Sequence, residues 1–105
     1  MANYTNESTD RLFEVITKIS TKEECQKFLE DICTIKEIKD MAQRLDTAVL
    51  LEQGFSYQKI AEIVGASSAT ISRVNRCLVY GEGGYKTALS KMSEDDKKKV
   101  ENGFK

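Results

Sequence analysis

The apolar residues between Ser56 and Val79 form two short stripes, one on each side of a glycine. Their members are Ile60, Ala61, Val64, Ile71, Val74 and Leu78. Spacings of three and four are those of an α-helix with one buried face. Gly65 stands between the stripes, where a residue of positive φ commonly ends a helix. Ser67 or Ser68 can cap the next helix by accepting a backbone N–H. The pattern therefore predicts a helix-turn-helix.

The same helical period predicts three helices before this hairpin. The first begins at about Ser8 and ends at Ser20. The second and third each open with the spacing of a capping box, Thr21 to Glu24 and Thr34 to Glu37, in which each side chain accepts the other residue's free N–H. The third runs to about Gln53. The residues expected to face inward are Leu12, Phe13, Ile16, Ile19, Cys25, Phe28, Leu29, Ile32, Ile35, Ile38, Met41, Ala42, Leu45, Ala48 and Val49.

The segment after the hairpin is weaker in pattern. Glycines at 81, 83 and 84 predict a break, followed by a weak helix from Tyr85 to Met92 and a short helix capped by Ser93. In that last helix acidic residues precede Lys97 to Lys99, the order that the helix dipole favours. The charged run is either a solvated face or a phosphate-binding tail. With no proline and no alternating strand pattern, the sequence predicts an all-α fold of about six helices.

Some apolar residues have no place on these stripes. Val15, Leu50 and Leu51 lie off them and are expected to remain uncovered by the chain itself. Burying such residues between two chains, at about 25 cal/mol per Å² of apolar area, favours a homodimer. Two recognition helices about 34 Å apart would then fit a two-fold site on a DNA duplex. We therefore predict one domain, 1–105, with dimerisation helices in 1–53, the helix-turn-helix in 54–80 and a C-terminal segment in 81–105.

Charge is distributed unevenly along the chain. The net charge is −1, but residues 1–53 carry seven Lys/Arg against eleven Asp/Glu, whereas residues 54–92 carry five against two. No carboxylate occurs from Gly65 to Gly81, and the outward residues of the second hairpin helix are small or cationic: Ser67, Ser68, Ala69, Ser72, Arg73 and Arg76. Such a surface suits the major groove of DNA. The alternatives are an ordinary helical hairpin, and pairing of the arginines with Glu62 or Glu82.

Several kinds of chemistry are not indicated. The chain has no histidine, and Cys25, Cys33 and Cys77 form no CxxC, so the cysteines are expected to be small buried hydrophobes and not redox or metal groups. No acid, base or nucleophile set is present, which predicts no enzyme activity, no cofactor and no metal. No apolar run could span a bilayer and no signal pattern is seen, so we expect a cytoplasmic protein without a membrane partner.

A family resemblance adds to this interpretation. The run RLDTAVLLEQGFSYQKIAEIVGASSATISRV resembles the Trp repressor superfamily, and its SYQKIAEIVGASSATISRV part looks most like the YerC/YecD-type branch. The resemblance implies an intertwined homodimer that binds double-stranded DNA as a transcriptional regulator, a repressor. It places Ser68, Ala69 and Ser72 toward the bases. It places Tyr57, Gln58, Lys59 and Arg73 near the DNA backbone or the groove edge. The alternative function is a protein-interaction module without direct DNA readout.

The sequence departs from the tryptophan-binding members of that family. In those relatives the amino acid lies between two arginines, and a glycine follows the second. Here Arg73 matches the second arginine, Val74 takes the place of the glycine, and Gln43 stands at the first arginine's place beside Arg44. A β-branched side chain would fill the slot that the indole ring needs. Tryptophan is therefore not expected as a ligand, and any effector pocket is expected near Arg44, Arg73 and Val74.

Overall fold

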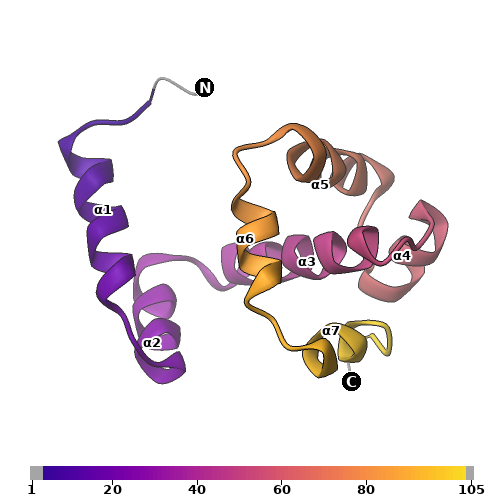
Figure 1. Cartoon of the computed structure of the whole chain (residues 1–105). Helices are drawn as coiled ribbons and strands as arrows, with labels where there is room; N and C mark the ends of the chain where they lie inside the picture. Colours follow the sequence, from indigo (N-terminus) through magenta and orange to yellow (C-terminus); the bar gives the residue numbers. More distant parts are fainter. Residues whose placement is uncertain (1–3, 104–105) are drawn as a thin grey trace. The chain divides into compact units, whose positions relative to one another are not determined.

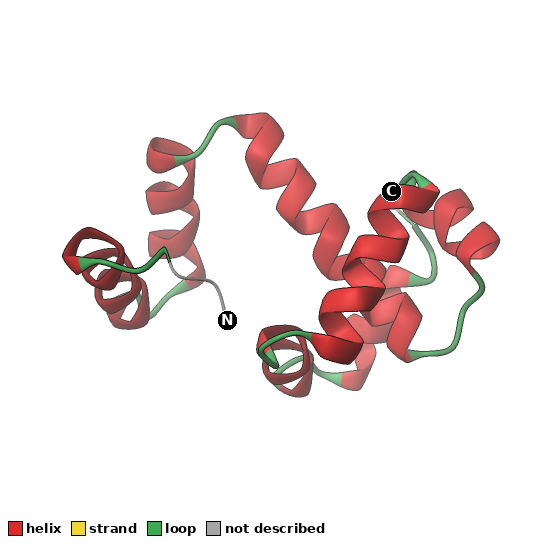
Figure 2. Ribbon diagram, turned by 90° about the horizontal axis from the view of Figure 1, so that it is seen from above, coloured by secondary structure: helices red, strands yellow, loops and turns green. Residues whose placement is uncertain are grey.

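The computed structural model describes residues 4–103, and every regular element in that range is a helix (Figure 2). The helices follow one another along the chain as labelled in Figure 1. Their bounds are α1 Glu7–Lys18, α2 Lys22–Ile32, α3 Ile35–Glu52, α4 Tyr57–Val64, α5 Ser68–Tyr80, α6 Gly84–Ser90 and α7 Glu94–Val100. The all-α prediction is confirmed, with seven helices in the described residues against the expected six or so.

The predicted caps start the second and third helices. Before α3, Thr34 and Glu37 form a complete capping box: the Glu37 carboxylate accepts the Thr34 N–H at 2.8 Å, and the Thr34 hydroxyl accepts the Glu37 N–H at 3.1 Å. At α2 the Thr21 hydroxyl accepts the Glu24 N–H at 3.1 Å. The Glu24 carboxylate accepts the Ser20 N–H at 3.2 Å, and this bond is the main cause that lowers the pKa of Glu24. Local side chains thus fix where these helices begin.

The chain forms two compact units, residues 1–38 and 39–105. In the first unit none of the described residues is buried. Of the large apolar side chains expected to face inward, five are 37 to 58% exposed, namely Leu12, Phe13, Ile16, Ile32 and Ile35. Four others are half-buried, namely Ile19, Phe28, Leu29 and Ile38. Val15, which was expected to stay uncovered, is also exposed. The expected inward stripe is therefore covered only in part within a single chain, because two short helices offer too little surface to cover each other fully.

The second unit contains the core. One cluster of buried residues is Leu50, Ile60, Val64, Ala66 and Ile71, and the other is Ala48, Val49, Val74 and Leu89. The expectation that Leu50 lacks cover within the chain is wrong, since its side chain is completely buried. Leu51, which is half-buried, packs against both clusters. The last turns of α3 are covered on more than one side, so residues off the main stripe are buried too. Met41 and Ala42, at the start of this unit, are exposed.

The cysteines differ from their prediction. Cys25 and Cys77 are exposed and Cys33 is half-buried, and all three are free thiols. Cys25 on α2 and Cys77 on α5 lie on faces that the rest of the single chain leaves open, and Cys33 at the end of α2 is covered only in part. Within residues 4–103 no cluster of three potential metal ligands occurs. None of the helices described has the length and apolar character needed to cross a membrane.

Candidate nucleic-acid interface

The turn between α4 and α5 has the predicted geometry. Gly65 ends α4 in the left-handed region, with φ of 73°, and its N–H donates to the Ala61 carbonyl at 2.9 Å. Of the two candidate caps for α5 it is Ser67 that serves, since its hydroxyl accepts the Thr70 N–H at 3.1 Å. A glycine at the left-handed position and a serine two residues later therefore hold the turn.

The inner faces of the two helices pack as the apolar stripes predict. Ile60 and Val64 of α4 and Ile71 and Val74 of α5 are all at most 5% exposed. Ala61, a member of the same predicted stripe, is half-buried against the first core cluster. Because the buried positions recur at helical spacing, the intervening residues of α5 necessarily face outward.

The outward residues include every position that the sequence assigned to DNA binding. All nine are exposed: Tyr57, Gln58, Lys59, Ser67, Ser68, Ala69, Ser72, Arg73 and Arg76. Three lie in the first turn of α4, and the others lie on α5 and its cap. The fold thus keeps the whole set accessible. Which of these side chains contact DNA stays a prediction.

The two arginines of α5 are not engaged by carboxylates. Among the residues that the structure describes, no ion pair involves Arg73 or Arg76, so the pairing with Glu62 or Glu82 that was left open is not formed. Glu62 instead lies 3.8 Å from the Lys59 ammonium. Both side chains are exposed, so the donors of each guanidinium are available to a carboxylate or phosphate.

A cavity of about 360 Å³ lies beside α5. Its lining residues are Arg44, Thr70, Arg73, Val74, Cys77 and Tyr85. The fold thus brings together the three positions at which an effector pocket was expected. Sequence reasoning missed the other three. Thr70 and Cys77 lie three or four residues from Arg73 and Val74 on α5, so helical spacing could have found them. Tyr85 comes from α6, and nothing local indicates that it approaches α5. Whether the cavity binds an effector stays a prediction.

Gln43, at the place of the first arginine in tryptophan-binding relatives, is used differently here. Its side-chain amide donates to the Val64 carbonyl at 3.1 Å, so it satisfies an orphan carbonyl at the end of α4. The backbone carbonyl of Gln43 in turn accepts the buried Thr47 hydroxyl at 2.7 Å. Gln43 is therefore a link between α3 and α4 and is not among the residues that line the cavity.

Comparison with known proteins agrees with this architecture. The family described as Trp repressor protein matches residues 7–93, which include α1 to α6. The chain belongs to the Trp repressor family. This is a family of regulators and not of enzymes. The match ends at Ser93, so α7 lies outside the part of the chain that the family describes.

Individual relatives support the YerC-type resemblance. The chain is 48% identical to the uncharacterized protein YerC of Bacillus subtilis (strain 168) over 87 residues, which are 83% of this chain and 84% of YerC. A crystal structure of a TrpR like protein from Eubacterium eligens is 40% identical and has a TM-score of 0.79, covering 86% of this chain and 96% of that one. A Staphylococcus aureus structure is 41% identical, with a TM-score of 0.80 and coverage of 84% and 88%. The predicted membership of a Trp repressor-like, YerC-type group is confirmed.

Proposed function

We propose that this member of the Trp repressor family is a sequence-specific DNA-binding transcriptional regulator that represses by occupying its operator. The observation that carries the proposal is the outer surface of α5, which has no carboxylate and presents Arg73 and Arg76 without ion-pair partners. Next to a polyanion, an exposed carboxylate would repel and a paired arginine would first have to release its partner. On this surface no carboxylate repels the DNA and neither arginine has to release an ion-pair partner.

The positions along α5 suit different parts of the duplex. Ser68, Ala69 and Ser72 are short, so they let the helix lie deep in the major groove and reach base edges directly or through water. Arg73 and Arg76 are long enough to reach phosphates on the groove walls. The first turn of α4, with Tyr57, Gln58 and Lys59, supplies further donors for the DNA backbone, and Ser67 marks a helix start whose free N–H groups favour a phosphate.

The functional unit in this proposal is an intertwined homodimer. In residues 4–38 no side chain is buried, although α1 and α2 carry a stripe of large apolar residues. Leaving that stripe in water is unfavourable by about 25 cal/mol per Å², and a second copy of the same stripe would cover it. Pairing also supplies the second recognition helix that a two-fold operator requires.

Tryptophan is not the ligand in this proposal. Val74 is 2% exposed and packs in the second core cluster, so its methyl groups stand where relatives need a glycine. Gln43 is bonded to the end of α4 and offers no positive charge to a carboxylate. Isothermal titration of the dimer with tryptophan is expected to give no heat of binding. Micromolar binding would contradict this part of the proposal.

The proposal is tested by selecting duplexes from a random pool at low salt. The protein is expected to enrich one two-fold symmetric sequence, and Ser72→Ala is expected to change which bases are preferred.

Arg73→Ala should reduce the dependence of log K on log salt concentration by about two, since each lost phosphate contact removes about 0.9 and a dimer has two such arginines. Lys98→Ala, which removes an exposed charge on α7, is the matched control and should leave both the salt dependence and the sequence preference unchanged. Failure to enrich any sequence would refute the proposal and favour a protein-docking role for the hairpin.

A further inference from the structure

The last helix, α7, lies beyond the part of the chain that matches the family, yet it contacts the core of the second unit. Ser93 caps it by accepting the Asp96 N–H at 3.1 Å. Exposed charged residues dominate its sequence, so by composition it should remain in solvent. Two of its residues do not, and they determine what the helix can do.

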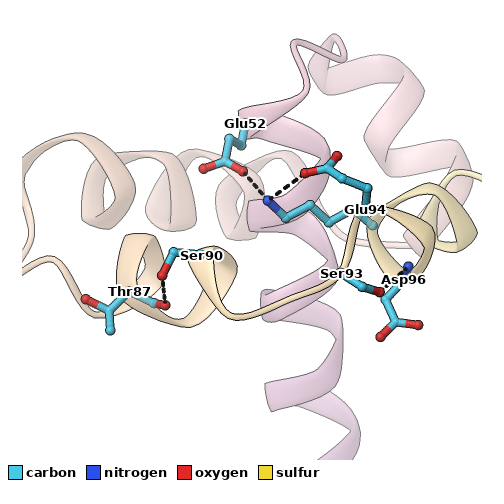
Figure 3. A network of polar contacts seen from close by, with 7 residues as sticks. Glu52, Thr87, Ser90, Ser93, Glu94 and Asp96 are labelled. Carbon is cyan, nitrogen blue, oxygen red and sulfur yellow. Dashed lines mark hydrogen bonds and ion pairs between the residues drawn. The ribbon is translucent and has the colours of Figure 1, made fainter.

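Lys97 is the first of these residues. Its side chain is only 14% exposed, whereas that of Lys99 is 76% exposed. The Lys97 ammonium lies 3.5 Å from the carboxylate of Glu52, the last residue of α3, and 3.9 Å from that of Glu94 (Figure 3). The aliphatic part of Lys97 therefore packs against the protein, and its ammonium pairs with two carboxylates. The pair with Glu52 links α7 to the end of α3.

Val100 is the second. It is half-buried and packs against both core clusters, one of which contains the last residue of α4, Val64, and the other Val74 of α5. The chain then passes close to α4, because a Cβ added at Gly103 would lie 3.5 Å from the Ile63 carbonyl oxygen. Val100 and Gly103 therefore lie close to the last turn of α4.

We propose that α7 is a positioning element for the DNA-reading hairpin. The last turn of α4 leads directly into the turn at Gly65 and so sets where α5 begins. Gln43 of α3 donates to the Val64 carbonyl, Gly103 approaches the neighbouring residue Ile63, and Val100 of α7 packs against the same core cluster. Side chains of α3 and α7 thus hold the hairpin against α3. That α7 affects DNA affinity rests on the proposed function, but that α7 holds the hairpin in place does not.

The first experiment measures backbone hydrogen exchange in the whole protein without DNA. Lys97→Met keeps most of the stem and removes the charge, and Val100→Ala removes the core contact. Both are expected to speed exchange of the amides in residues 61–70 by about fivefold or more, while the amides of residues 45–50 in α3 change little. Lys97→Arg, which keeps the charge, should leave the exchange rate of these amides at the wild-type value. Lys98→Met, an exposed neighbour on the same helix, is the control and should have no effect.

The outcomes separate this inference from the function on which it draws. Unchanged exchange in residues 61–70 for both Lys97→Met and Val100→Ala would overturn it, as would an equal increase throughout α3 and α5, which would mean a general loss of stability. With the selected duplex, both variants are expected to bind at least severalfold more weakly than Lys98→Met, and wild-type affinity would overturn the claim that α7 positions the hairpin for DNA. If the wild-type protein selects no duplex, the proposed function fails, and the exchange rates still decide whether α7 holds the hairpin.

Discussion

Replacing Gly65 by alanine tests the turn on which the hairpin depends. Gly65 has φ of 73° and ψ of 17°, and a Cβ added there would meet no atom within 4 Å. The substitution therefore creates no clash, and its cost comes from the backbone alone. A non-glycine residue in the left-handed region is disfavoured by about 1 to 2 kcal/mol, of which alanine recovers part by restricting the unfolded chain. We expect Gly65→Ala to lower the free energy of unfolding by about 1 kcal/mol.

The matched control is Gly84→Ala. Gly84 is the first residue of α6, its φ is not in the left-handed region, and a Cβ added there also meets nothing within 4 Å. The same chemical change should here stabilise the protein by about 0.5 kcal/mol. If the two substitutions change the free energy of unfolding in opposite directions at sites with equal space for a Cβ, the difference comes from the backbone conformation.

Urea denaturation at one fixed protein concentration measures both effects. With an m-value of about 2 kcal/mol per molar, the midpoint should fall by about 0.5 M for Gly65→Ala and rise by about 0.25 M for Gly84→Ala, with m unchanged. The midpoint of Gly65→Asn should fall less than that of Gly65→Ala, since asparagine tolerates the left-handed region better than alanine. A Gly65→Ala midpoint equal to or above that of the wild type would refute the reasoning, because it would mean that the turn does not need positive φ.

Three further predictions concern the core, a cap and a carboxyl group. Leu50→Ala should destabilise the protein by about 2 to 5 kcal/mol in the same urea assay, because the residue is completely buried; a loss below 1 kcal/mol would contradict this. Ser67→Ala should cost about 1 kcal/mol and Ser68→Ala much less, since only Ser67 caps α5; equal effects would mean that the cap contributes nothing. Burial raises the pKa of Asp46, so the stability that its neutral form provides is complete below about pH 4 and is lost as pH rises through the raised pKa. Asp46→Asn should therefore stabilise the protein at pH 7 and have little effect at pH 3, and the opposite pH dependence would exclude burial as the main influence on this group.

The sequence by itself determined the local structure of this protein. Thr34 with Glu37, Gly65 and Ser67 each act through atoms within a few residues along the chain, so their hydrogen bonds and backbone angles follow from sequence spacing. The outward set on α5 was predicted for the same reason, because helical period alone decides which residues oppose Ile71 and Val74. The family likeness then related this local pattern to a known fold.

Only the tertiary structure decided which faces are covered. Leu50 was expected to be uncovered and is fully buried, whereas Cys77 was expected to be buried and is exposed. Gln43 bonds to Val64, 21 residues away, and Lys97 bonds to Glu52, 45 residues away. Helical period groups residues into faces, but burial of a face depends on segments far along the chain that approach it. Contacts of that kind hold α3, α4 and α7 together, and no local spacing encodes them.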